Sequence, residues 1–241
     1  MIKFFRKIRY DLMEKNKIGK YFKYAIGEIV LVVIGILIAL QINNWNERRK
    51  ASIVEVEILK EIKSSLQKDL DNLKGNSRTQ NNILRSQSLI LDWIEKDLEY
   101  HDSLSNHFGY LTNLTIFRPN TSTFESLKQM GLRTITSDSL RNKILNLYEN
   151  EYHGHSTIYN ILDEATKSLD DLNYNFFKAE GYRGMKLIPL NENKLKSNHE
   201  YEFKLRELRD RNSGYIDYFT PRLSKEITLT MNAIDDFLKS Q

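Results

Sequence analysis

The chain has no cysteine and very little proline or glycine. Because none of its 241 residues is cysteine, disulfides, thiol nucleophiles and cysteine metal sites are excluded. Three prolines and ten glycines punctuate the chain, and apolar residues recur every three or four positions. That spacing is typical of helices rather than strands. We therefore predict an all-α protein.

Sequence motifs of the common enzyme classes are also missing. The chain contains no G-x-S-x-G, no phosphate-binding or dinucleotide-binding glycine motif and no H-E-x-x-H. Ser126, within TFESLK, fits a packed helix residue better than a nucleophile. We predict no catalytic residue, no metal and no cofactor, so the chain is not expected to be an enzyme.

One long hydrophobic run is present, AIGEIVLVVIGILIALQI, at residues 25–42. As a helix its eighteen residues cover roughly 27 Å, close to the hydrocarbon thickness of a bilayer. Aromatic residues typical of membrane interfaces border it on both sides, namely Tyr21, Phe22, Tyr24 and Trp45. We predict a transmembrane helix over residues 24–45.

Two other interpretations of the run are open. One is a buried helix of a soluble protein, which we disfavour because the run is apolar on every face. A cleaved signal peptide would end in a small-x-small site, but the run ends in Leu40-Gln41-Ile42. An uncleaved signal anchor is therefore the preferred interpretation.

The charges around the run predict its orientation. Residues 1–23 carry a net charge of +6, from eight basic and two acidic residues. The positive-inside tendency places this leader in the cytoplasm and residues 46–241 on the other side of the membrane. Arg48, Arg49 and Lys50 are a counter-signal. Since the leader holds the whole basic surplus, its anionic partner is expected to be membrane lipid rather than nucleic acid.

The leader also has an amphipathic pattern. Phe5, Ile8 and Leu12 fall at helical spacing, and basic residues occupy the other face. This pattern predicts a short helix lying in the cytoplasmic membrane interface. The residues expected at the lipid surface are Lys3, Arg6, Lys7 and Arg9. The alternative is a flexible basic tail that only sets the topology.

The remaining residues, 46–241, are enough for one helical domain. The first helix should run on from the span and stop at Gly75. Its apolar stripe is Val54, Ile58, Ile62, Leu66, Leu70 and Leu73. A second helix should bury Ile83, Ile90, Trp93, Ile94 and Leu98. Ser122 and Glu125 resemble a capping box, Gly131 should end that helix, and Ser137 should cap the next. The helices predicted after this continuation of the span are 79–98, 103–111, 122–130, 138–177 with a break near Gly154, 200–211 and 222–239, with a loop at 181–198. Long helices with short links predict an antiparallel bundle.

Two stretches of the chain resemble a known family. They are YAIGEIVLVVIGILIALQINNWNE at 24–47 and TFESLKQMGLRTITSDSLRNKILNLYE at 123–149. Both resemble domain of unknown function 6090, a family of single-span membrane proteins from Bacteroidota. The resemblance implies a Gram-negative inner membrane with the large domain in the periplasm. It implies no activity.

A stripe of small and polar residues follows one side of the predicted span. At 100° per residue, Glu28, Gly35, Ala39 and Asn46 lie within about 20° of one direction. Gly35 and Ala39 form a small-xxx-small pair, which allows close helix approach. Glu28 could reach the interface or pair with Lys20 or Lys23, lie in an oligomer or partner interface, or relay protons.

Histidines and carboxylates cluster in ENEYHGH. Glu149 and His153 are four residues apart, as are Glu151 and His155. Di-iron bundles instead use Glu-x-x-His, repeated on a second helix. We therefore expect surface pairs at a helix end rather than a metal site.

Three classes of function follow. The preferred one is an interaction, scaffold or assembly subunit of the inner membrane that forms a homo-oligomer, or binds a membrane-protein partner, through its span. The second is a periplasmic ligand-sensing bundle that signals through a partner, because the leader is too short for an output domain. The third, an enzyme, lacks any supporting motif.

Overall fold

The computed structural model describes residues 18–181 and 186–240. The chain divides into two compact units, one ending at Val54 and the other beginning at Glu55. Helix α2 (Ile18–Glu95) contributes to both. All but eight of the residues assigned to regular elements are helical, which confirms the all-α prediction.

In the first unit, no described residue covers the apolar part of α2. Its large side chains between Ile26 and Ile42 are each about half exposed or more. Within the described residues, this is the one helix long and apolar enough to cross a membrane. An apolar surface open on every side of a helix is typical of a segment whose solvent is lipid.

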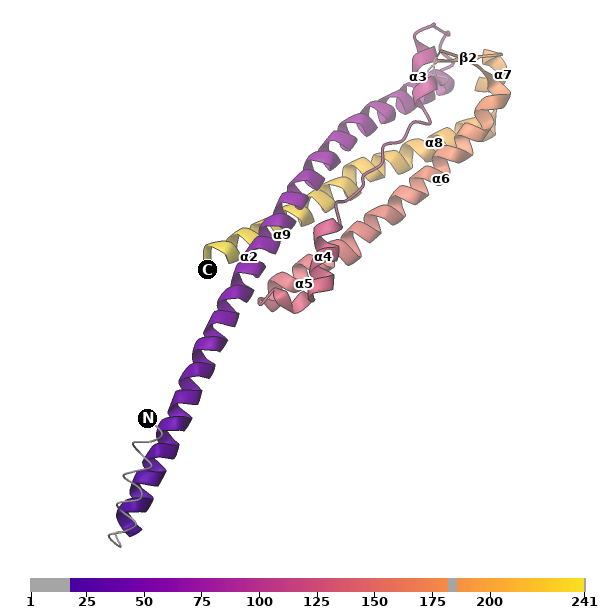
Figure 1. Cartoon of the computed structure of the whole chain (residues 1–241). Coiled ribbons are helices and arrows are strands. Elements are labelled where there is room, and N and C mark those ends of the chain that lie inside the picture. Colours follow the sequence, from indigo (N-terminus) through magenta and orange to yellow (C-terminus); the bar gives the residue numbers. More distant parts are fainter. Residues whose placement is uncertain (1–17, 182–185, 241) are drawn as a thin grey trace. The chain divides into compact units, whose positions relative to one another are not determined.

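The second unit consists of three long helical rods (Figure 1). The first is α2 from Glu55 onward. The second joins α5 (Asp138–Asn146), the π-helical segment η2 (Leu147–Glu151) and α6 (Tyr152–Phe176). The third joins α8 (His199–Gly214), the π-helical segment η4 (Tyr215–Phe219) and α9 (Thr220–Ser240). The shorter elements are α3 (Leu104–Tyr110), α4 (Ser122–Met130), η1 (Leu132–Thr134), β1 (Phe177–Glu180), β2 (Lys186–Pro189) and α7 (Glu192–Lys196).

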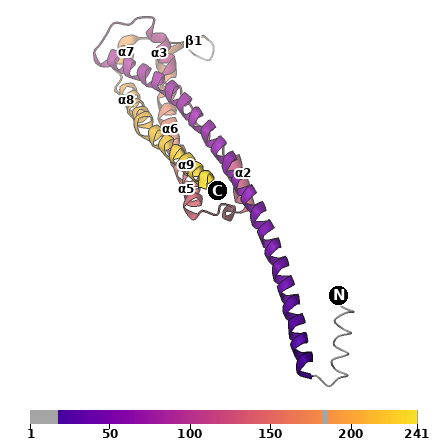
Figure 2. The ribbon, with the colours of Figure 1, turned by 90° about the vertical axis from the view of Figure 1, so that its left-hand side faces the viewer.

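Cross-rod contacts fix the directions of the rods. Glu55 contacts Thr136 and Asp69 contacts Tyr152, so α2 and the α5–α6 rod run in the same direction. Gln87 contacts Asn212, whereas the earlier residue Lys63 contacts Asp235 near the C-terminus. The α8–α9 rod is therefore antiparallel to the other two, as the views in Figures 1 and 2 agree.

The interior of this unit holds two hydrophobic clusters. One surrounds Trp93, whose ring makes edge-on contacts with Phe108 and Tyr100. The other is formed by Leu59, Ile62 and Leu66 of α2 with side chains of α4, α5 and α9. Each cluster draws on residues distant in sequence, so the rods hold one another in place.

A polar seam on α2 binds the extended segment that returns the chain from α3 to α4. Gln87 donates to the carbonyl of Leu111, Gln80 accepts from the amide of Thr115, and Asn76 donates to the carbonyl of Ile116. Asp69 then accepts from the amide of Asn120 at 2.8 Å. Glu55 continues the seam beyond α4, because it accepts from the amide of Thr136 at 2.7 Å, just before α5. These side chains supply the partners that a strand or helix would otherwise provide.

The predicted stop at Gly75 is wrong, because α2 continues to Glu95. Asn76, Thr79 and Asn81 hydrogen-bond to groups four residues earlier on the helix, and Asn76 also contacts the returning segment. A glycine costs a helix only about 1 kcal/mol, which the tertiary contacts offset. Leu98 lies beyond the helix end and is 47% exposed, so its predicted burial is also wrong.

The caps of the next helices are partly as predicted. Ser122 lies inside α4, whose N-cap is Thr121, and no capping box forms with Glu125. Ser122 instead donates to Asn120. Gly131 ends the helix at φ 100°, as expected, and the Ser137 hydroxyl accepts from the amide of Leu140.

The predicted interruptions at Gly154 and in 212–221 are absent. The α5–α6 and α8–α9 rods each continue through one π-helical turn, η2 and η4, rather than a break. The predicted loop at 181–198 is also wrong in part. β1 pairs with β2 in antiparallel register, and Asn191 caps α7 by accepting from the amide of Lys194.

Candidate functional site

The four stripe residues lie on one uninterrupted helix. Gly35, Ala39 and Asn46 are all exposed, and α2 passes through Glu28 and each of them without a break. A methyl group added at Gly35 would meet no described atom within 4 Å. The helical geometry that the stripe requires is therefore present, and its use as an interface remains a prediction. Lys3, Arg6, Lys7 and Arg9 lie outside the described residues.

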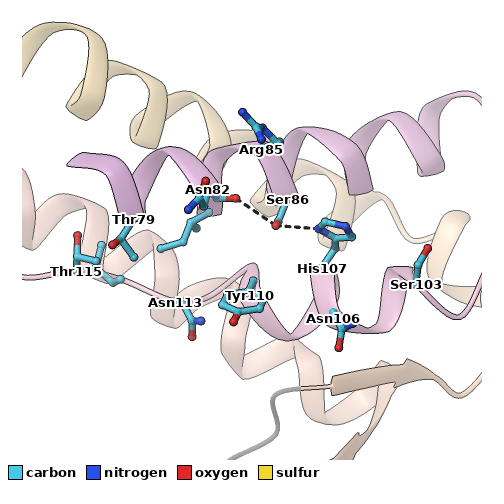
Figure 3. Close-up of a pocket in the computed structure, with 12 residues that line it drawn as sticks. Thr79, Asn82, Arg85, Ser86, Ser103, Asn106, His107, Tyr110, Asn113 and Thr115 are labelled. Carbon is cyan, nitrogen blue, oxygen red and sulfur yellow. Dashed lines mark hydrogen bonds between the residues drawn. The ribbon is translucent and has the colours of Figure 1, made fainter. Parts of the chain in front are cut away.

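A polar groove of about 760 Å³ lies in the second unit, between α2, α3 and the segment that follows α3 (Figure 3). Amide and hydroxyl side chains dominate its lining, with Ile83 and Leu114 as its apolar part. Its polar residues are Thr79, Asn82, Arg85, Ser86, Ser103, Asn106, His107, Tyr110, Asn113 and Thr115. No sequence motif indicated this groove, because its residues come from three separate segments.

A hydrogen bond joins α2 to α3 within the lining of the groove. The hydroxyl oxygen of Ser86 is 3.0 Å from Nδ1 of His107 and 3.2 Å from the carbonyl oxygen of Asn82 (Figure 3). Ser86 is buried, and no carboxylate of the described chain contacts His107. The pair joins two helices but lacks the third group that would orient a catalytic base. The absence of enzyme activity remains a prediction.

A second polar cluster surrounds Asp69, which is 2% exposed. One carboxylate oxygen accepts from the amide of Asn120 and the other from the hydroxyl of Tyr152 at 2.6 Å. Burial raises the pKa of Asp69, although both hydrogen bonds act to lower it. Burial, followed by the charge of Asp69, also raises the pKa of the Tyr148 and Tyr152 hydroxyls. Tyr152 therefore keeps its proton at physiological pH and donates a hydrogen bond to Asp69.

The ENEYHGH cluster does not form the surface pairs that we predicted. His155 is 7% exposed, and its ring contacts the rings of Phe117 and Tyr215. Its Nε2 atom is buried without a hydrogen-bond partner, and burial lowers the pKa of His155 to about 4. The prediction failed because His155 lies on the same face of α6 as the buried residues Leu162 and Leu169.

The carboxylates of the same cluster pair with other helices. Glu149 accepts from Lys128 and Glu151 from Arg222. On the neighbouring helix α5, Arg141 pairs with Asp138. In the part of the chain that the structure describes, no group of three histidine or acidic side chains could hold a metal ion.

Fold and sites together define a class: a helical protein that combines an apolar helix of membrane-spanning length with a three-rod bundle. The chain belongs to a family of unknown function, DUF6090, whose model matches residues 28–183. That match begins at Glu28 and contains the whole 123–149 motif, so it confirms the resemblance seen in the sequence. Comparisons with curated proteins and with solved structures find no match.

Proposed function

We propose that this protein is a single-pass inner-membrane subunit that acts by interaction and self-associates through its span. The observation that carries the proposal is the apolar part of α2, whose side chains are open on every face. In water this surface would drive aggregation, whereas in lipid it needs no protein cover. The stripe then becomes the one face suited to another helix.

The basic leader supports a definite orientation. Its net charge of +6 favours the cytoplasmic side, which places the bundle in the periplasm. The absence of cysteine lets single cysteines report this directly. In cells of a Gram-negative host with a permeabilised outer membrane, Asn232→Cys should react with a membrane-impermeant maleimide. Asn16→Cys should react only after lysis, and the reverse labelling would overturn the orientation.

The stripe predicts which positions meet across a homo-oligomer. Asn46 has the direction of Glu28, whereas Asn44 points about 160° away. In isolated membranes, a bismaleimide should therefore cross-link Asn46→Cys chains into dimers and leave Asn44→Cys chains monomeric. Equal cross-linking of the two would mean that random collision, not the stripe, brings the chains together.

A glycine pair supplies the matched test of close approach. Gly35→Leu, made in the Asn46→Cys chain, should weaken dimerisation about fivefold to thirtyfold, because leucine holds the backbones apart. Gly27 lies about 100° away from the stripe and is equally open, so Gly27→Leu should leave dimerisation unchanged. If Gly35→Leu dimerises like the parent, the stripe is not the interface.

A further inference from the structure

We propose that the groove between α2 and α3 binds a neutral saccharide. The groove lies in the second unit, so the proposal goes beyond the membrane interaction and does not depend on it. Its volume of about 760 Å³ falls within the range of about 300–1,000 Å³ typical of small-molecule sites. A ligand here would also supply what the sensing hypothesis requires.

Unused hydrogen-bonding capacity is the first argument. Asn82, Asn106 and Asn113 make no side-chain hydrogen bond to any described residue, and neither does the Tyr110 hydroxyl. Each amide offers two donors and an acceptor. Neighbouring hydroxyl groups of a sugar ring each donate and accept, so they match this set of side chains.

The charge of the lining is the second argument. No carboxylate and no lysine line the groove. Its one permanent cation, Arg85, projects from the side of α2 opposite to His107 and Tyr110 (Figure 3). Apart from Arg85 and the His107 imidazole, the hydrogen-bonding groups of the lining are amides and hydroxyls, which favours an uncharged polar ligand over an anion.

The mixed character of the groove is the third argument. Tyr110 is 42% exposed, and Ile83 and Leu114 form an apolar part beside the amides. A sugar ring has an apolar C–H face and a polar edge, so it can cover an aromatic ring while its hydroxyls bond to amides. The Ser86–His107 bond fixes the distance between the two helices that carry these groups.

Titration calorimetry tests the proposal on the full chain in a lipid nanodisc, which avoids sugar-based detergents. The probes are maltose, cellobiose and diacetylchitobiose, with glucuronate and inorganic phosphate as anionic comparisons. At least one neutral disaccharide should bind. Asn82→Ala and Tyr110→Ala should each weaken it about fivefold or more, as expected for a lost hydrogen bond or ring contact.

Matched controls lie nearby. Asn81→Ala removes an exposed amide of the same helix outside the groove, and Tyr174→Ala removes a phenol that is 89% exposed. Both should bind like the wild type. Absence of binding by every neutral probe at about 10 mM, binding of the anions alone, or equal losses in groove and control variants would each overturn the proposal, while leaving the membrane function untouched.

Discussion

Replacement of Asp69 by alanine is expected to destabilise the bundle by about 3 kcal/mol or more. The change leaves two donors without an acceptor, the amide of Asn120 and the hydroxyl of Tyr152. Each buried donor left unsatisfied costs about 1–3 kcal/mol. For a unit of this size the midpoint of thermal unfolding should fall by about 6–12 °C. Circular dichroism of the full chain in micelles measures this midpoint.

Two variants separate this effect from a general loss of charge. Asp71 lies two residues further along α2 and is exposed, so Asp71→Ala should change stability by less than about 0.5 kcal/mol. Tyr152→Phe removes one of the two donors and should make a later Asp69→Ala change less costly. Equal losses in Asp69→Ala and Asp71→Ala would show that the cluster is not a structural anchor.

The second large effect is a loss of stability in acid through His155. Because the folded pKa is about 4 and the reference value is 6.5, the unfolded chain binds a proton at pH values where the folded chain does not. Stability therefore falls as pH decreases from 6.5 to 4, by about 3 kcal/mol from this residue. Chemical unfolding measured at several pH values should show that slope.

His155→Phe should remove this contribution and retain the contacts with Phe117 and Tyr215. The gain relative to wild type should be about 2 kcal/mol at pH 5 and small at pH 7. Asp69, whose pKa burial raises, acts in the opposite sense and gains stability as pH falls, but it is present in both proteins. Exposed His153→Phe should follow the wild-type profile. Parallel profiles for His155→Phe and wild type would contradict the mechanism.

Periodicity alone predicted much of this fold. The stripe of Ile58, Ile62 and Leu66 is buried as expected, because apolar spacing reports directly which face of a helix meets a core. The predictions of helix ends failed where tertiary contacts determine whether a helix continues. Gly75 reads as a helix stop, yet the neighbouring Asn76 gains hydrogen bonds to Thr115 and Ile116 of the returning segment. A prediction from neighbouring residues alone cannot include hydrogen bonds to a distant segment.

The candidate sites also differ in whether they lie within one segment or combine several segments. The stripe of Glu28, Gly35, Ala39 and Asn46 follows from helical angles within one segment, so it could be proposed from the sequence. The groove unites Asn82, His107 and Asn113 from three segments, and no spacing predicts it. His155 was misplaced for a further reason: the prediction used the local Glu–His spacing, whereas His155 shares the buried face of α6 with Leu162 and Leu169.

The polar seam of α2 also bears on how this chain can change in length. The side chains that form the seam lie within a sector of about 60° around the helix axis. They are Glu55, Asp69, Asn76, Gln80 and Gln87. One residue inserted into α2 between two of these side chains would rotate all those on one side of the insertion by about 100° about the helix axis. The rotated side chains would then lose their backbone partners. A substitution removes one of these side chains, whereas an insertion or deletion misaligns several of them. Variation in length should therefore be tolerated at the tips of the bundle and rejected along α2.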